Sequence, residues 1–154
     1  MYYTLLTLHS LNRWLVITSL VLAIYYSWIG LRTNRIFTDS ANTVRHLTAT
    51  ISHVQLMLGL YLYMISPIVK FSVANAAITN VVSDHLFFRI IHIALMVISV
   101  VVLTIGSARA KRESTDRLKY KTMLIWFSVA LLIILIAIPW PFSPLANRPY
   151  LRSF

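Results

Sequence analysis

The sequence contains no cysteine, three glycines and only four acidic residues among 154. Without cysteine the chain cannot form disulfides, thiolate zinc sites, iron–sulfur clusters or a covalently attached c-type haem. The acidic residues all lie between apolar runs or at helix ends, and they are Asp39, Asp84, Glu113 and Asp116. We therefore expect no pair of buried carboxylates, which argues against acid–base hydrolysis and against a carboxylate proton relay. The sequence also lacks a glycine-rich phosphate loop and a nucleophile motif.

Apolar residues are abundant, at 58% of the chain, whereas charged residues make up only 12%. A soluble domain carries about twice that charged fraction. The surplus is concentrated in four apolar runs, each near the ~20 residues that cross a bilayer. The sequence therefore predicts an all-α integral membrane four-helix bundle that forms a single domain over 1–154. The four spans are predicted at residues 5–30, 44–66, 85–106 and 120–138.

The formal net charge of +10 could indicate a nucleic-acid partner. We reject this interpretation because the basic residues flank the apolar runs and do not form a soluble, aromatic-interleaved face. The N-terminal stretch "MYYTLLTLHS" has no basic region, and no small-residue cleavage site follows its apolar run. It is therefore interpreted as the start of a retained helix and not as a signal peptide.

Basic residues also predict the orientation of the spans, because cytoplasmic loops are enriched in lysine and arginine. The connection after 5–30 and the connection after 85–106 carry most of the positive charge: Arg32, Arg35, Arg45, Arg109, Lys111, Arg112, Arg117, Lys119 and Lys121. These two connections are predicted to be cytoplasmic. Both termini are then expected on the outer, periplasmic side of a bacterial inner membrane.

Two histidines fall well inside predicted spans, His53 in 44–66 and His92 in 85–106. Ionisable side chains inside a membrane are costly and usually functional. Each histidine lies on a helical stripe, with small residues beside His53 and with Phe88 and Met96 beside His92. Two imidazoles on facing helices with apolar walls suit a b-type haem. We therefore predict His53 and His92 as the metal ligands of one noncovalent haem.

Two other interpretations of these histidines stay open. Neutral imidazoles could simply hydrogen-bond polar side chains of neighbouring helices. Alternatively, the spacing of His53 with Met57 and of His92 with Met96, four residues apart, combines imidazole and thioether groups that suit copper(I). His46 and His85 fall at the membrane interfaces and are expected to be solvated.

The segment "HSLNRW" places His9, Asn12 and Arg13 on one helical face. Arg13 could extend to the outer interface, or it could neutralise a buried anion such as a haem propionate. His9 is a third candidate ligand, a partner for a propionate, or a proton-exchanging group near a quinol. A separate stripe in 44–66 combines small and polar residues, Thr48, Ser52, Gln55 and Gly59, and we interpret it as a helix-packing surface.

The stretches "HSLNRW", "HVQLMLGLYLYMISP", "HIALM" and "IPWPFSPLANRPY" together resemble short four-helix bacterial membrane proteins labelled cytochrome b. The resemblance covers nearly the whole chain. It implies a b-type haem, with His9, Arg13, His53 and His92 at the matching positions.

The expected function is therefore membrane electron transfer with one haem b, within or beside a respiratory quinol-oxidising complex. In this role the chain is an electron carrier or an oxidoreductase subunit, and its partners are lipid, quinol and a larger respiratory complex or further copies of itself. The alternative is a cofactor-free accessory or assembly subunit of a respiratory membrane complex, whose polar stripes contact partner helices.

Overall fold

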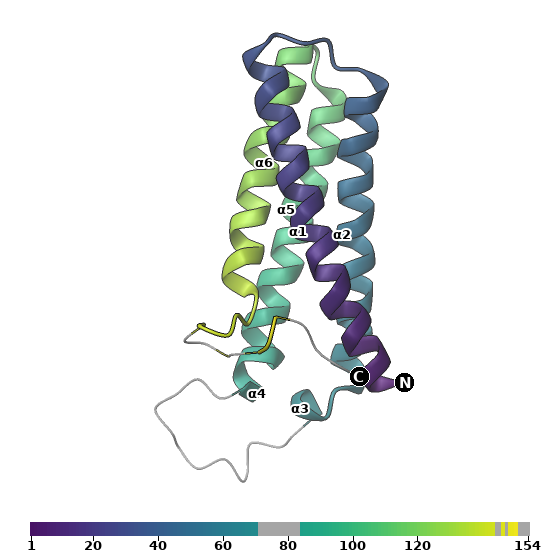
Figure 1. Cartoon of the computed structure of the whole chain (residues 1–154), viewed down its shortest axis with the longest axis vertical. Helices are drawn as coiled ribbons and strands as arrows, with labels where there is room; N and C mark the ends of the chain where they lie inside the picture. The colour runs from purple at the N-terminus through teal and green to yellow at the C-terminus, as the bar shows by residue number, and fades with distance from the viewer. Residues whose placement is uncertain (71–83, 144–145, 147, 151–154) are drawn as a thin grey trace.

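The computed structural model describes residues 1–70, 84–143, 146 and 148–150. Four long helical segments run alternately up and down beside one another (Figure 1). The elements are α1 (Tyr2–Arg32), α2 (Asp39–Ile65), α3 (Pro67–Lys70), α4 (Asp84–Leu86), the π-helical turn η2 (Phe87–Ile91), α5 (His92–Arg112) and α6 (Asp116–Ala137).

All four long segments are long and apolar enough to cross a membrane: α1, α2, the continuous run Asp84–Arg112 and α6. The prediction of an all-α transmembrane bundle is therefore confirmed for the described residues. We call the end at which α1 begins and α2 and α6 finish the terminal end. The opposite end, where α1 connects to α2 and α5 connects to α6, is the loop end (Figure 1).

Two helices begin earlier than the hydropathy pattern predicted, because a threonine caps each of them. Thr38 accepts a hydrogen bond from the Ala41 amide, and Thr115 accepts one from the Leu118 amide. Such caps satisfy amides that have no partner inside the helix. An aspartate follows each cap in the first turn, where it favours the helix dipole. Polar first turns therefore extend α2 and α6 beyond their apolar runs.

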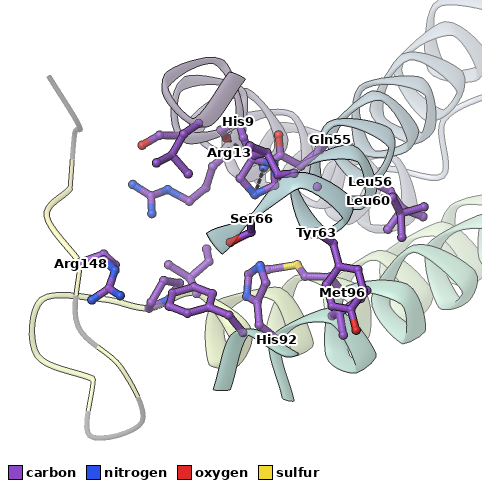
Figure 2. A pocket seen from close by; sticks show the side chains of 18 of the residues that line it. His9, Arg13, Gln55, Leu56, Leu60, Tyr63, Ser66, His92, Met96 and Arg148 are labelled. Carbon is purple, nitrogen blue, oxygen red and sulfur yellow. Dashed lines mark hydrogen bonds between the residues drawn. The ribbon is translucent and has the colours of Figure 1, made fainter. Parts of the chain in front are cut away.

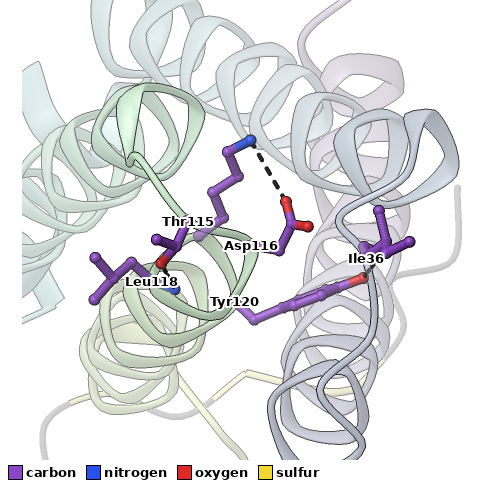
Figure 3. A network of polar contacts seen from close by, with 6 residues as sticks. Ile36, Thr115, Asp116, Leu118 and Tyr120 are labelled. Atoms are coloured by element: carbon purple, nitrogen blue, oxygen red, sulfur yellow. Dashed lines mark hydrogen bonds and ion pairs between the residues drawn. The ribbon is translucent and has the colours of Figure 1, made fainter.

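Figure 3 shows how the start of α6 is tied to its surroundings at the loop end. Asp116 pairs with Lys119 at 3.8 Å, and the Tyr120 hydroxyl donates to the Ile36 carbonyl at 3.2 Å. The Tyr120 ring is almost fully buried. The Tyr120 bond connects α6 to the segment between α1 and α2, whereas the ion pair lies within the first turn of α6.

Around the bundle, α1 packs on α2 and α6, and α5 packs on α6 and α2. Helices α1 and α5 therefore lie diagonally opposite each other. The core between them is apolar and consists of Val16, Leu20, Ala23, Leu103, Ala110, Met123, Phe127, Ala130, Ile134 and Ile138. A side chain on α1 and a side chain on α5 can consequently face the same interior space.

Each of the three glycines lies where another side chain approaches its helix closely. A Cβ at Gly30 would overlap the Tyr120 ring, and a Cβ at Gly106 would overlap Trp126 Cβ. Gly59 faces the His9 imidazole, whose Cε1 would lie 3.1 Å from an added Cβ. Small residues allow such close approach between membrane helices. The glycines therefore set the contacts α1–α6, α5–α6 and α1–α2.

Replacing Gly106 with alanine is expected to lower the free energy of unfolding by about 1–3 kcal/mol. The added methyl group would overlap Trp126 Cβ, an atom that moves only with the α6 backbone. Reversible unfolding in mixed dodecylmaltoside and SDS micelles measures the change. Ala108→Val, at an exposed position of the same helix, is the matched control and should leave stability within about 0.5 kcal/mol. Equal stabilities of the two variants would contradict the packing argument.

Candidate functional site

A cavity of about 170 Å³ lies inside the bundle near the terminal end, between α1, α2, α5 and the end of α6. Its lining residues on α2 run from Ser52 to Tyr63, which is about 17 Å of helix axis. The walls are mainly apolar. The polar side chains that line it are Tyr2, His9, Ser10, Arg13, Ser52, Gln55, Tyr63, Ser66, His92, Ser99 and Arg148.

His92 is oriented by a backbone carbonyl that a proline leaves without a helical partner. In a continuing helix, the Ala137 carbonyl would accept a hydrogen bond from residue 141, but Pro141 has no N–H. The His92 ring supplies the missing donor, with Nδ1–H donating to the Ala137 oxygen at 2.8 Å. This bond leaves Nε2 as the nitrogen that carries the lone pair, on a ring that lines the cavity. The arrangement is typical of metal-ligating histidines.

The preceding proline acts in the same way on the C-terminal segment. Pro139 cannot donate to the Leu135 carbonyl, and the Trp140 indole N–H donates to that oxygen at 2.8 Å instead. The Pro139 carbonyl accepts in turn from the Arg148 amide at 3.2 Å. The segment after α6 therefore turns back on itself and carries Arg148 to the cavity wall.

The π-helical turn Phe87–Ile91 directly precedes His92. Such turns are rare and occur often at functional sites. Two aromatic rings of this turn flank the imidazole, with ring centroids 5.7 Å away for Phe87 and 5.8 Å away for Phe88. Phe87 is fully buried. The turn therefore encloses His92 in an apolar wall, a feature that hydropathy and helical periodicity do not predict.

His9 is held on the α1 side of the cavity by a polar network. The Asn12 amide donates to Gln55 Oε1 at 2.9 Å, and Gln55 Nε2 donates to the His9 carbonyl at 3.0 Å. The same Gln55 nitrogen lies 3.3 Å from His9 Nε2. The second ring nitrogen, Nδ1, is buried without a hydrogen-bond partner among the described residues. Because an amide nitrogen only donates, His9 Nε2 is the acceptor in the Gln55 contact and Nδ1 carries the ring hydrogen. A buried N–H without an acceptor is costly, so this ring has an unused hydrogen-bonding capacity.

His9 and His92 lie at matching depths. His9 is seven residues from the start of α1 and His92 is eight residues from Asp84, which places them about 10 Å and about 12 Å from the terminal end of their helices. Figure 2 shows the two imidazoles on opposite walls of the cavity, with Met96 beside His92. The structure thus brings His9 and His92 to one site from two diagonal helices.

His53 lies elsewhere. It is twelve residues from the end of α2, about 18 Å deep, and its side chain is exposed on the bundle surface. Its Nε2 lies 2.9 Å from Thr104 Oγ1 of α5. His53 does not line the cavity that contains His92. The structure therefore places His9, and not the sequence-predicted His53, in the cavity that His92 lines.

The other histidines and the copper pattern are also separated from this site. His46 is exposed on α2, and His85 Nε2 lies 3.5 Å from the Arg89 guanidinium. Met57 is 70% exposed, whereas Met96 lines the cavity. Among the described residues, no group of three or more histidine, aspartate or glutamate side chains could hold a bare metal ion.

Two arginines from distant parts of the chain line the cavity near the C-terminal segment (Figure 2). Arg13 donates to the Tyr150 carbonyl, and Trp14 Nε1 donates to the same oxygen at 3.2 Å. Arg148 pairs with Asp84 and lies over the Phe88 ring at 5.1 Å. This end of the cavity is therefore positively charged. The sequence analysis named Arg13 as a possible partner for a buried anion but did not name Arg148. Only the fold of the C-terminal segment brings Arg148 to the cavity.

Comparison of the chain with protein-family models, curated proteins and solved structures finds no match. The resemblance to membrane proteins labelled cytochrome b therefore stays a prediction, and the site has to be interpreted from its own geometry.

Replacing Gln55 with leucine is expected to lower the free energy of unfolding by about 1–2 kcal/mol. The variant loses the Asn12 bond and the contacts to His9, and it leaves the Asn12 amide without its partner. Unfolding in mixed micelles measures the effect. Thr50→Val is the control, since Thr50 is exposed on α2 and its hydroxyl bonds only its own helix at the His46 carbonyl. A loss for Gln55→Leu no larger than that for Thr50→Val would show that the network does not hold α1 on α2.

Proposed function

We propose that this protein is a membrane cytochrome of the b type that binds one haem noncovalently between His9 and His92. The observation that carries the proposal is the hydrogen bond from His92 Nδ1 to the Ala137 carbonyl, which leaves Nε2 with its lone pair on a cavity-lining ring. His9 lines the opposite wall at a similar depth (Figure 2). Two axial imidazoles on facing helices are a common way to hold haem in a bundle.

Three features of the cavity fit this group. His9 lines the cavity, and its buried Nδ1 has no hydrogen-bond partner among the described residues; ligation through Nδ1 would require its proton to leave and the Gln55 contact at Nε2 to be exchanged. Apolar side chains cover most of the wall, as a porphyrin ring requires. Arg13 and Arg148 place guanidinium groups at one end, where a haem carboxylate would find a partner in Arg13 and would compete with Asp84 for Arg148.

Each residue has a defined part in this proposal. The Ala137 carbonyl orients the His92 ring and raises the basicity of its Nε2, as outer-shell partners of ligating histidines do. Gln55 of α2 bonds the His9 carbonyl and contacts its ring, and Gly59 leaves room for that ring against α2. Phe87 and Phe88 exclude water from the His92 side. When bound, the haem supplies reversible one-electron chemistry.

As an electron carrier, the chain would serve a respiratory complex rather than act as a stand-alone enzyme. The electron source that we propose is a membrane quinol, and the acceptor is a larger oxidoreductase or a periplasmic carrier. The competing function, a cofactor-free accessory subunit, predicts a colourless protein.

The purified protein is expected to be coloured and, on reduction, to give the sharp visible bands of six-coordinate low-spin haem. His9→Ala and His92→Ala should each lower haem content at least about tenfold, because each removes an imidazole that would hold the haem. The reduced-minus-oxidised absorption spectrum and the haem-to-protein ratio measure both effects. His46→Ala, which alters an exposed histidine of α2, is the control and should leave the spectrum unchanged.

His53→Ala distinguishes the two candidate ligand pairs. The geometry predicts an unchanged spectrum for this variant, since His53 bonds Thr104 outside the cavity. A loss of low-spin haem in His53→Ala with a normal spectrum in His9→Ala would restore the pair predicted from sequence. A colourless preparation from haem-replete cells would favour the accessory function.

We also propose that the terminal end faces outward in a bacterial inner membrane. The supporting observation is the charge at the loop end, which carries Arg32, Arg35, Arg109, Lys111, Arg112, Arg117, Lys119 and Lys121.

Because the chain has no cysteine, single cysteines can report this orientation. In intact spheroplasts, a membrane-impermeant maleimide should label Thr4→Cys at the terminal end and should not label Ser114→Cys at the loop end. Both side chains are exposed. Permeabilised cells, in which both cysteines should react, provide the control. The reverse labelling pattern would overturn the proposed orientation.

A further inference from the structure

The cavity approaches the outer surface of the bundle at one α2 residue on the side facing α5. Leu60 of α2 lines the cavity and is also 41% exposed. In a transmembrane bundle this surface faces lipid. Figure 2 shows Leu56 and Leu60 on the side of the cavity away from Arg13 and Arg148. The cavity therefore has a charged end under the C-terminal segment and an apolar opening toward the bilayer, which we call the side opening.

Two hydrogen bonds between α2 and neighbouring segments bound the side opening. Near the terminal end, the Tyr63 hydroxyl donates to the Arg89 carbonyl of η2 at 3.4 Å. Toward the loop end, His53 bonds Thr104 of α5 at 2.9 Å. On α2 these positions are about 15 Å apart along the axis. At ~100° per residue, His53 and Tyr63 lie within the same ~80° sector as Leu56 and Leu60.

The Thr104 bond determines which nitrogen of His53 can accept. The Thr104 hydroxyl donates to the Val100 carbonyl at 2.6 Å, so its oxygen is the acceptor for His53 Nε2–H. His53 Nδ1 then carries the lone pair. No described residue donates to it, although the side chain is exposed on the lipid-facing surface. An acceptor in hydrocarbon without a donor is costly, which points to a function.

The depth of His53 restricts what can supply the donor. His53 lies about 21 Å from the start of α2 and about 18 Å from its end, close to the middle of the span. A phospholipid headgroup is charged and stays at the interface, so it does not reach this depth. The ligand must be lipid-soluble, with an uncharged O–H donor on a compact head and an apolar tail that remains in the bilayer. A quinol has these properties.

We propose that the side opening between α2 and α5 binds a lipid-soluble quinol, whose hydroxyl donates to His53 Nδ1. Leu56 and Leu60 then contact the ring or the first part of the tail, and the Thr104 bond keeps the His53 acceptor in place. The site rests on the proposed function only in that a haem in the adjoining cavity would receive the electrons; binding itself requires no haem. It gives His53 a role as a positioning residue for the quinol.

Photo-crosslinking of the full chain in lipid nanodiscs with a short-tailed azido-quinol, kept reduced under anaerobic conditions, tests the site, and mass spectrometry locates the adduct. Competition with unlabelled decylubiquinol gives the affinity. We expect adducts on α2 near His53–Leu60 and on α5 near Met96–Thr104. His53→Phe should weaken competition about tenfold because it removes the acceptor. Leu60→Trp should weaken it similarly by filling the side opening. Leu132→Trp, at a 60% exposed position of α6, is the control and should have no effect.

Each remaining outcome also decides the proposal. Adducts elsewhere, or competition that is the same in the wild type, His53→Phe and Leu60→Trp, would overturn it. So would displacement of the probe by excess phospholipid alone, or dissociation of an oligomer by His53→Phe, since the second result assigns the surface to a partner helix. If His53→Phe does not fold, Leu60→Trp still tests the site, because it leaves the Thr104 bond intact.

The haem spectrum recorded on the same variants separates this inference from the proposed function. A coloured protein that binds the quinol equally well with and without the two substitutions would support the haem and exclude the side opening. A colourless protein that binds the probe in a His53-dependent way would support the quinol site at the side opening and exclude the haem.

Discussion

The contact on which the site depends is the hydrogen bond between the His92 imidazole and the Ala137 carbonyl. It follows from a constraint of membrane interiors, where every backbone polar group needs a partner within the protein. Pro141 withholds the amide that would have served this carbonyl. The end of one helix thereby fixes the tautomer and orientation of a histidine on its neighbour. Pro139 likewise leaves the Leu135 carbonyl without a backbone donor, and the Trp140 indole N–H bonds that oxygen instead. The Pro139 carbonyl also positions Arg148 by accepting from its amide.

Hydropathy was sufficient to predict the class of the fold, because each apolar run has the length that a bilayer requires. It misplaced helix starts where Thr38 and Thr115 cap polar first turns, which carry no apolar signal. His9, Arg13 and His92 were recognisable as costly groups in apolar surroundings. The sequence did not show that these residues line one cavity, since this depends on α1 and α5 lying diagonally across the bundle. Gln55 was assigned to packing, and the structure adds that it bonds His9.

The two histidine environments illustrate how similar sequence surroundings lead to different chemistry. The ring of His92 is enclosed by Phe87 and Phe88, whereas His53 is exposed toward lipid and bonded to Thr104. Both imidazoles have one nitrogen occupied by a neighbouring helix. What differs is the space before the other nitrogen, an internal cavity in one case and the bilayer in the other. The proposed haem and quinol sites therefore adjoin each other across the wall formed by α2 and α5.

The π-helical turn Phe87–Ile91 separates two parts of the Asp84–Arg112 segment that have different partners. C-terminal to the turn, His92 hydrogen-bonds the Ala137 carbonyl of α6. N-terminal to the turn, Asp84 pairs with Arg148 of the C-terminal segment. The turn accommodates one residue more than a regular α-helical turn. Removing that residue would rotate the segment before the turn, Asp84–Leu86, by about 100° around the helix axis. Asp84 would then leave Arg148, and the C-terminal segment would keep only its contacts to α1 and to the end of α6.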